Sequence, residues 1–333
     1  MSEERILLGH GGGGSLMQQL IDRELRSLYR DPALVLHDAM RLELPYGPLA
    51  FSTDSYVVQP LEFTGGNIGE LAAIGTANDL AMAGAQPLHL SVGLILEEGL
   101  ELALLRRLLR GLRSACDACG LAVATGDTKV VERGKADGLY INTSGIGLCQ
   151  TREPIGPAAI RPGDQLLLSG DLGRHGVAVL AARHGLALEP AIPSDCQPLW
   201  PAVETLLAAG VELHCLRDLT RGGLASALQE LAEAAQLDLR LEESCLPVAP
   251  VVQRCCDLLG LEPLHLACEG RFVAVVPPQA VEPALALLAP QGGCWCGSVE
   301  AGAGVPGRVR LVTAYGSERL MPPASGELLP RIC

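Results

Sequence analysis

Residues 68–96 of the chain read IGELAAIGTANDLAMAGAQPLHLSVGLIL, and two different patterns meet within this stretch. Residues 68–85 are apolar almost all round and include many small side chains, which is typical of a closely packed, fully buried helix. Residues 87–96 are rich in strand-forming side chains, and so are residues 49–58 on the other side of the helix. The stretch therefore predicts a strand–helix–strand unit of an α/β protein.

The same alternation continues along the chain in both directions. Residues 101–120 predict another helix, residues 121–127 and 138–149 predict two more strands, and the proline-rich segment 151–164 is typical of a linker. The second half repeats the rhythm. It has predicted strands over 164–173, 237–243, 271–277 and 295–300, predicted helices around 176–185, 200–210 and 280–290, and a turn that opens a helix within 214–235.

These elements predict an α/β fold with two α/β domains, over residues 1–150 and 151–315. Residues 316–333 lack any helical or strand periodicity and carry Pro322, Pro323 and Pro330. Such a composition is typical of a mobile tail, so we expect a flexible arm at the C-terminus.

The composition argues against several classes of protein. Hydrophobic residues make up 48% of the 333 residues and charged residues only 19%, which excludes an intrinsically disordered chain. A net charge of −13 and an aromatic content of 3% argue against a nucleic-acid partner. No apolar run reaches about 18 residues, and the N-terminus lacks the basic segment of a signal peptide. We therefore expect a cytoplasmic protein without a membrane span.

Twelve cysteines are present, and in a cytosolic chain most of them are expected to be reduced and buried. Cys116 and Cys119 form a CxxC pair, but no second pair at zinc-binding spacing accompanies it. Cys333 differs from the others because it is the last residue. A thiol at the end of a flexible arm of up to about 50 Å is suited to carry a covalently bound group between sites.

A glycine run near the N-terminus is a candidate phosphate-binding loop. Residues 9–15 read GHGGGGS and precede an amphipathic segment that predicts a helix, so backbone N–H groups can approach an anion closely. The segment is not a P-loop because it lacks the required lysine. The alternative is a glycine run without function. The predicted phosphate-binding residues are Gly11, Gly12, Gly13 and Gly14.

Five aspartates interrupt apolar segments or stand at the ends of predicted elements. A carboxylate among apolar neighbours is costly unless a metal or a partner satisfies it, and several together fit Mg²⁺, which bridges phosphates. A single one has a simpler explanation, since Asp218 alone would cap a helix that begins at Thr220. The five predicted magnesium ligands are Asp38, Asp54, Asp79, Asp127 and Asp218.

Two further residues are candidates for the chemistry itself. Lys129 is one of only two lysines in the chain and directly follows Gly-Asp-Thr, which favours a specific use of a compact ammonium over a surface lysine on a turn. Glu269 precedes a glycine at the start of an apolar segment. It is either a turn residue or a general base whose pKa is raised by burial.

Eight motifs occur in order along almost the whole chain: GHGGGG, FSTDSYVV, GGNIGELAAIGTANDLAMAGA, GDTKVVERG, NTSGIG, RDLTRGG, CEGR and LPRIC. Together they resemble the HypE family of hydrogenase-maturation proteins, and the terminal Pro-Arg-Ile-Cys is the most specific of them. The remainder is similar, more loosely, to a superfamily of ATP-using enzymes that includes aminoimidazole ribonucleotide synthetase, selenophosphate synthetase and thiamine-phosphate kinase.

The resemblance implies an activity and a set of partners. An N-terminal ATP-binding domain would pair in a homodimer, with ATP and Mg²⁺ held between the domains. The carbamoyltransferase HypF would load a carbamoyl group onto Cys333, and this chain would dehydrate it to a thiocyanate with ATP. The cyano group would pass to iron on the HypC–HypD complex, as a cyanide ligand of the [NiFe]-hydrogenase centre.

The resemblance also assigns roles to particular positions. Glu269 would be the base and Lys129 would orient it or the phosphate, or these two roles would be reversed. The remaining nucleotide-binding positions implied by the motifs are Asp54, Asn78, Asp79, Asp127, Thr128, Asn142, Thr220 and Arg221.

Two motifs depart from the family's usual pattern. His37-Asp38-Ala39-Met40 stands where Asp-Asp-Ala-Ala is common, and CEGR replaces Asn-Glu-Gly-Lys. Three alternative functions stay open at this point. A selenophosphate synthetase would need a cysteine near the N-terminus, but none precedes Cys116. A non-catalytic scaffold for iron-cofactor assembly would hydrolyse no nucleotide, and a thiol-based metal chaperone would need clustered cysteines.

Overall fold

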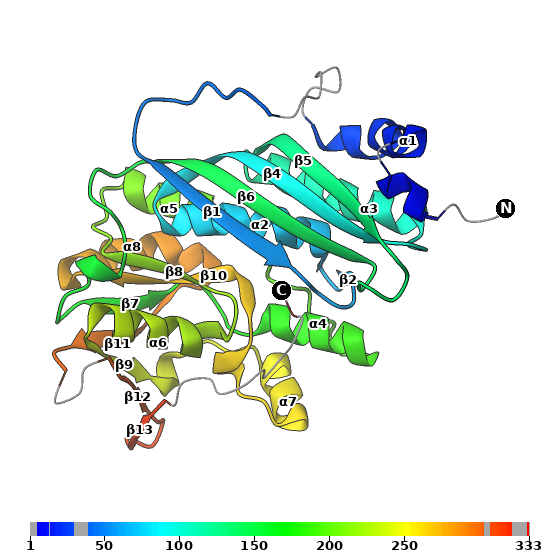
Figure 1. Ribbon diagram of the computed structural model, residues 1–333. Helices are drawn as coiled ribbons and strands as arrows, with labels where there is room; N and C mark the ends of the chain where they lie inside the picture. Colours follow the sequence, from blue (N-terminus) through cyan, green and yellow to red (C-terminus); the bar gives the residue numbers. More distant parts are fainter. Residues whose placement is uncertain (1–4, 13, 30–38, 303–306, 322–331, 333) are drawn as a thin grey trace.

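The computed structural model describes residues 5–12, 14–29, 39–302, 307–321 and 332 of the chain (Figure 1). Strands and helices form a mixed α/β fold with two main sheets, as predicted. The first sheet has four strands in the order β1-β6-β4-β5. Its strands are β1 (Leu49–Tyr56), β4 (Ala85–Glu97), β5 (Ala122–Val131) and β6 (Leu139–Cys149).

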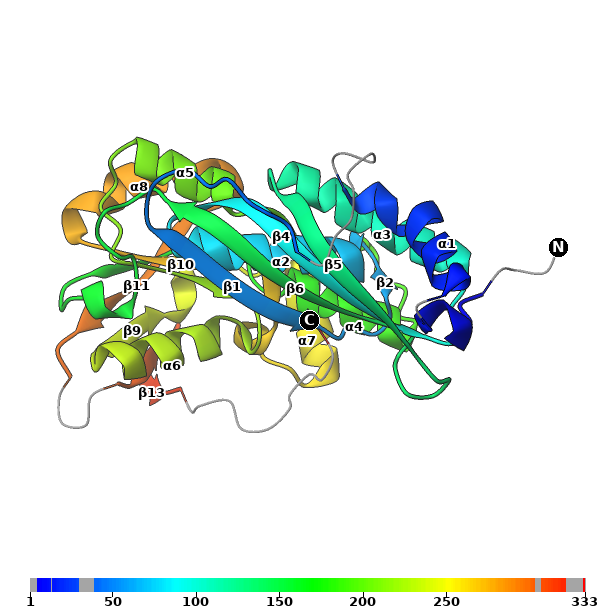
Figure 2. The same cartoon turned by 45° about the horizontal axis from the view of Figure 1, so that its top comes forward.

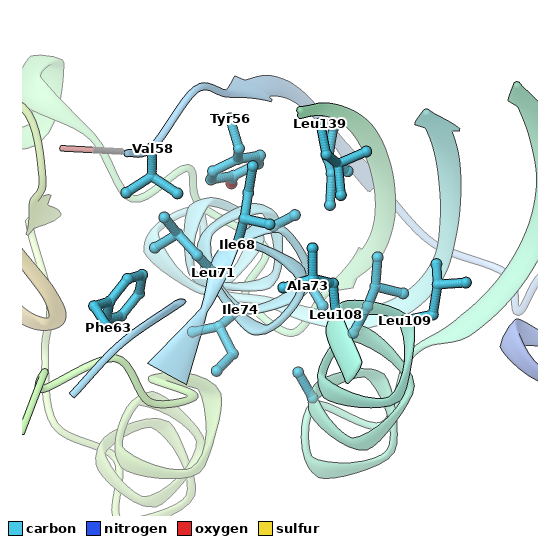
Figure 3. Close-up of a cluster of buried hydrophobic side chains, with 14 of the residues drawn as sticks. Tyr56, Val58, Phe63, Ile68, Leu71, Ala73, Ile74, Leu108, Leu109 and Leu139 are labelled. Carbon is cyan, nitrogen blue, oxygen red and sulfur yellow. The ribbon is translucent and has the colours of Figure 1, made fainter. Parts of the chain in front are cut away.

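The central helix α2 (Ile68–Met82) lies between the two sheets. Every residue of α2 except Glu70 and Asp79 is buried, as its apolar sequence predicted. Small residues allow this packing, because a Cβ on Gly69 would lie only 2.1 Å from the Leu108 carbonyl oxygen of α3 (Leu102–Ala118). Figure 3 shows the cluster around α2, in which Tyr56, Leu108 and Leu139 come from β1, α3 and β6.

Within the described ranges, α2 and α3 cover one face of the four-stranded sheet, and in Figure 2 the sheet lies in front of α2. The other face, which we call the open face, carries exposed apolar side chains: Phe51 is 71% exposed, Leu49 46% and Ile95 40%. Because side chains alternate between the two faces of a strand, register alone assigns the remaining residues to one face or the other.

The second sheet has seven strands in the order β13-β12-β9-β11-β7-β10-β8. Helix α6 (Gly223–Ala235) packs on one face, and α5 (Trp200–Ala208) and α8 (Val281–Leu288) pack on the other. The strands are β7 (Gln165–Leu168), β8 (Cys215–Leu219), β9 (Asp238–Glu242), β10 (Cys268–Val276), β11 (Cys294–Glu300), β12 (Val309–Val312) and β13 (Glu318–Leu320). A third, two-stranded sheet pairs β2 (Glu62–Phe63) with β3 (Gly66–Asn67).

The two halves of the chain share part of one hydrophobic core. Helices α4 (Arg174–His184) and α7 (Pro250–Leu259) contribute Val177 and Val252 to the cluster that contains Ile68. The sheets therefore divide between β6 and β7, whereas the packing continues across that division. In the described part of the chain, no helix is long and apolar enough to cross a membrane.

The structure differs from the sequence analysis at three places: the alternative role of Asp218, one helix that was not predicted and the start of the tail. Asp218 caps no helix, because it lies inside β8 and α6 begins only at Gly223. Helix α7 was not predicted, since its sequence begins with a proline and two β-branched residues. The tail was expected to be irregular from Gly316, but β13 pairs with β12 and Met321 is buried. Residues 322–331 and 333 lie outside the described residues.

Candidate active site

Three carboxyl groups approach one another where α2 passes between the sheets. Asp79 is the polar interruption in α2, Asp218 lies in β8, and Asp54 lies in β1 on the face that packs against α2. The Asp79 carboxyl hydrogen-bonds that of Asp218 and also accepts a hydrogen bond from Ser52 Oγ at 2.6 Å. Burial raises the pKa of both carboxyls, and the Asp79 charge raises that of Asp218 further. Burial and mutual repulsion thus both oppose ionisation of the two carboxyls together.

Glu269 lies at an irregularity in β10, where the register with β8 shifts between Cys268 and Phe272. Its side chain is 2% exposed, and among the described residues no hydrogen-bond partner reaches its Oε1. Burial raises the pKa of Glu269 well above its usual value, and the charges of Asp218 and Asp195 raise it further. A buried carboxyl with a raised pKa and an unpartnered oxygen is a candidate general base or acid.

Residues 194–197 form a loop that contacts the backbone of Glu269. Asp195 Oδ1 accepts a hydrogen bond from the Glu269 backbone N–H at 3.1 Å, and burial raises the pKa of Asp195 to about 6. The loop lies so close to β10 that a Cβ on Gly270 would be 1.8 Å from the Asp195 carbonyl oxygen. Gly270 therefore has a packing role in the CEGR motif, since only glycine allows this approach.

The other end of this loop reaches the C-terminal segment. His175 of α4 is fully buried, with its Nδ1 2.9 Å from Ser194 Oγ and its Nε2 2.9 Å from the Ile332 carbonyl oxygen. Phe63 meets the imidazole edge-on, with the two ring centroids 5.3 Å apart. Ile332 is itself buried and belongs to the hydrophobic cluster around α2. The carbonyl of the residue before Cys333 is thus bound by an imidazole that also bonds the loop that contacts Glu269.

Asp127 and Lys129 are brought together, but away from this cluster. Lys129 Nζ lies 2.8 Å from each Asp127 carboxylate oxygen, and both side chains are largely exposed. Lys129 is in register with the open-face residue Ile95. Because β5 is three strands from β1, this ion pair lies about 14 Å across the sheet from Asp54, and on the opposite face.

Comparisons with known proteins cover both halves of the chain. Residues 33–149 match the family "AIR synthase related protein, N-terminal domain", and residues 161–309 match its C-terminal domain. Carbamoyl dehydratase HypE of Rhodobacter capsulatus is 46% identical over 100% of this chain and 99% of its own length. The chain belongs to the HypE family.

Two solved HypE structures are informative. A crystal structure of the hydrogenase maturation protein HypE in complex with ATP is 42% identical, with a TM-score of 0.94, covering 98% of this chain and 99% of that chain. A crystal structure of the HypE–HypF complex matches with 35% identity and a TM-score of 0.79, covering 93% of this chain and 99% of that chain. The family resemblance deduced from the eight motifs is thereby confirmed.

Lys129 does not lie beside Glu269 of the same chain, contrary to one of the two roles expected for it. Lys129 is on the open face of the first sheet, whereas Glu269 lies on the side of α2, where its backbone carbonyl accepts from Asn78. Asn142 is also on the open face, and its amide donates to the Asp54 carbonyl and to Ser55 Oγ. Lys129 therefore cannot orient Glu269 of the same chain in this arrangement.

Asn78 also has a different role from the one expected. Its amide donates to the Gln197 and Glu269 carbonyl oxygens and accepts from the Leu199 N–H at 2.8 Å. Both amide hydrogens are thus used within the chain, and the side chain is almost fully buried. Asn78 is suited to join α2 to the 194–197 loop, and not to bind a nucleotide directly.

The glycine run and the turn after β8 occupy two further places. Gly11 lies against β5, because a Cβ there would be 3.0 Å from Val130 Cβ, and Gly14 precedes α1 (Ser15–Arg23). Gly12 donates its N–H to the Gly9 carbonyl, while Gly13, Asp38 and Cys333 lie outside the described residues. Thr128 is buried next to Asp127, and Thr220 and Arg221 follow Asp218 at the end of β8.

A magnesium ion fits some of the expected ligands. Within the described ranges, no three histidine, cysteine or acidic side chains form a ready-made metal site. Mg²⁺, however, commonly takes one or two carboxylates and completes its shell with water and phosphate oxygens, so the Asp79–Asp218 pair fits it. Asp127 does not fit in this arrangement, because both its oxygens accept hydrogen bonds from Lys129.

Sequence reasoning missed His175, Ser194 and Asp195. Each is a single polar residue in a helix or loop without a recognisable motif, and its importance depends on contacts with residues far away in the chain. The Arg-His-Gly sequence at 174–176 matches no motif that would indicate a buried imidazole. Its one indication is that His175 is a polar residue followed by the apolar residues of α4.

Proposed function

We propose that this HypE chain catalyses the ATP-dependent dehydration of a carbamoyl group bound to Cys333, producing S-cyanocysteine. The full-length similarity to a carbamoyl dehydratase and to a HypE structure in complex with ATP supports the reaction class. The observation that carries the proposal is the buried Glu269 carboxyl, which has an unpartnered oxygen. The 194–197 loop bonds both the Glu269 backbone and His175, whose imidazole binds the Ile332 carbonyl.

The chemistry requires an amide oxygen to become a leaving group. The carbonyl oxygen of the S-carbamoyl group attacks the γ-phosphorus of ATP, the bond to the bridging oxygen breaks, and ADP leaves. Glu269 accepts one amide proton, which gives an S-bound phosphorylated imidate. The carbon–oxygen bond then breaks, the leaving phosphate takes the second nitrogen-bound proton, and the carbon–nitrogen triple bond forms. The net products are thiocyanate, ADP and phosphate.

The environment of Glu269 suits this proton transfer. A carboxylate with its ordinary pKa is a weak base toward an amide, and burial raises the pKa of Glu269 well above that value. The burial of Glu269 also limits access of water, which would otherwise hydrolyse the phosphorylated intermediate. Gly270 and Asp195 hold the carboxyl's backbone in place, since the loop is pressed against β10 there.

Asp79 and Asp218 are the pair that would hold Mg²⁺, which when bound neutralises charge developing on the transferred phosphate. Asp54 lies close enough to raise the pKa of both through its charge. Gly11, Gly12 and Gly14 are our candidates for contacts with phosphates, but they lie beside β5, three strands from Asp54, so they would reach a nucleotide held by the partner chain of the homodimer proposed below. The N-terminal domain, residues 1–150, would thus supply most of the nucleotide site.

We further propose a homodimer formed through the open face of the first sheet. The exposed Phe51, Leu49 and Ile95 side chains support this, because an apolar sheet face of this kind is commonly covered by a partner. In such a dimer Lys129 and Asp127 lie at the interface. Lys129 would then act on the nucleotide or on the partner chain, and not on Glu269 of its own chain.

The terminal segment would exchange between two proteins and its own active site. The HypE–HypF structure supports a carbamoyltransferase of the HypF type as the donor of the carbamoyl group. The cyano group would pass to iron on a HypC–HypD complex for the [NiFe]-hydrogenase centre, in the cytoplasm. The terminal Cys333 would be the carrier at the end of the 316–333 segment.

Intact-mass spectrometry tests the proposed function directly. After incubation with the carbamoyltransferase and its substrates, Cys333 should gain about 43 Da, and with ATP in the active site this gain should fall to about 25 Da. Cys333→Ser should show neither change. ATP hydrolysis without a mass change on Cys333, as a scaffold with an incidental ATPase would show, would overturn the proposal.

A further inference from the structure

The Ile332 carbonyl is held by a series of hydrogen bonds that depends on one buried imidazole, that of His175. A backbone carbonyl can only accept a hydrogen bond, so His175 Nε2 must carry the hydrogen that points to the Ile332 oxygen at 2.9 Å. A neutral imidazole then has an unprotonated Nδ1, which accepts from the Ser194 hydroxyl at 2.9 Å. The contact with Ile332 therefore determines the tautomer of His175.

Ser194 completes this series of hydrogen bonds and connects it to the loop beside Glu269. Its Oγ accepts a hydrogen bond from the Cys196 backbone N–H at 3.1 Å, and its own N–H donates to the Thr64 carbonyl at 2.8 Å. The hydroxyl hydrogen is thereby left for His175 Nδ1. Phe63 packs edge-on against the ring and restricts its rotation. Ser194 and Phe63 thus restrict the imidazole orientation in addition to the bond with Ile332.

Because these hydrogen bonds are buried, loss of the contact with Ile332 is energetically costly. His175 has no exposed surface, and Ile332 is 4% exposed. When the terminal segment leaves, Nε2–H loses its acceptor in a buried position, which is unfavourable unless water replaces it. The hydrogen bond therefore favours the buried position of Ile332 without any contact to Cys333 itself.

We propose that His175, oriented by Ser194, is a positioning residue that holds the Ile332 carbonyl and so keeps Ile332 close to the loop that contacts Glu269. The proposal rests on the proposed function, in which Cys333, one peptide bond beyond Ile332, carries the reacting group. It assigns no role in proton transfer to His175. Its role is to increase the fraction of time that Ile332 occupies its buried position at His175.

Three variants separate this role from general stability. His175→Phe keeps a ring of similar size against Phe63 but removes the donor, whereas His175→Gln restores a donor near the position of Nε2. Ser194→Ala removes the partner of Nδ1 and leaves the imidazole in place. His184→Phe, on the exposed end of the same helix α4, is the matched control.

The first measurement is the release of Cys333 and Ile332 by a carboxypeptidase, followed by intact mass on the full-length chain. Release should be about tenfold faster for His175→Phe than for the wild type, because one buried hydrogen bond is lost. Ser194→Ala should give a smaller increase, and His175→Gln and His184→Phe should stay near the wild-type rate. Equal release rates for the wild type, His175→Phe and Ser194→Ala would overturn the proposal. Should His175→Phe fail to fold, Ser194→Ala against the wild type decides the question.

The second measurement uses chains already carbamoylated on Cys333. His175→Phe should lower the rate constant of ATP-dependent dehydration severalfold at saturating ATP while the KM for ATP is unchanged, and His175→Gln should restore most of it. An unchanged rate constant for His175→Phe would contradict the proposal. Because carboxypeptidase release requires no catalysis, it tests the positioning role even if the wild-type chain fails to dehydrate the carbamoyl group.

Discussion

The side-chain amide nitrogen of Asn78 lies 3.0 Å from the backbone carbonyl oxygen of Glu269, although 191 residues separate the two in the chain. This contact joins the helix between the sheets to the strand that carries the candidate base. The same amide group also bonds the Gln197 carbonyl and the Leu199 N–H. The position of Glu269 therefore depends on α2 as much as on β10.

Replacing Asn78 by alanine should destabilise the protein by about 3 kcal/mol, because it leaves three buried backbone groups without their partner. Denaturant unfolding measures this change. Asn142→Ala, which removes bonds at the open face, should cost less than about 1 kcal/mol. Equal losses for the two variants would contradict the joining role of Asn78.

Gly270→Ala should disturb the site through the backbone alone. The added Cβ would lie 1.8 Å from the Asp195 carbonyl oxygen, so the 194–197 loop must move away from β10. We expect a loss of about 2–4 kcal/mol in unfolding free energy and a large loss of dehydratase activity. The control is Gly156→Ala, since Gly156 has extended backbone angles and nothing within 4 Å of its Cβ position. A Gly270→Ala variant as stable as Gly156→Ala would show that the loop is not pressed against β10.

His175 should make stability depend on pH in the acid range. Burial lowers its pKa from 6.5 to about 4, so between these values the unfolded chain binds a proton that the folded chain does not. The contribution is complete above pH 6.5 and is lost as the pH falls toward 4, by about 3 kcal/mol. His175→Phe should flatten this part of the curve of unfolding free energy against pH. A curve of the same slope in wild type and variant would exclude a buried neutral imidazole.

Asp195 should have the opposite effect in the same pH range. Burial raises its pKa from 3.8 to about 6, so the folded chain holds a proton that the unfolded chain releases. The free energy of unfolding should therefore fall by about 3 kcal/mol as the pH rises from about 4 to 6. Asp195→Asn keeps an acceptor for the Glu269 N–H and should remove this fall. Wild-type pH dependence in the Asn variant would place the pKa of Asp195 near its ordinary value.

The sequence predicted most of the helices and strands, and α2 is the clearest example. A helix that is apolar on every side leaves few positions in an α/β protein other than between two layers, and α2 lies there. Strand β8 was harder to predict, because its five residues include an arginine and an aspartate and run into the turn before α6. Strand β13 has three exposed residues and depends on its pairing with β12.

The candidate site was predicted in its chemistry and only partly in its arrangement. Asp79, Asp218 and Glu269 were recognised as acids among apolar residues, and they do come together. The separation of Lys129 from Glu269 was not predicted, because a residue's face of the sheet depends on a register that one position changes. His175 and Asp195 acquire their properties only from burial by segments distant in sequence.

The most direct test of the account is the fate of the carbamoyl group in Glu269→Gln. This variant removes the proton acceptor while keeping the size of the side chain, and exposed Glu153→Gln is its matched control. With carbamoylated Cys333 and ATP, we expect the added mass of the control to fall from about 43 Da to about 25 Da, as in the wild type. Glu269→Gln should remain at about 43 Da. Conversion of Glu269→Gln at the wild-type rate would contradict the assignment of Glu269 as the base.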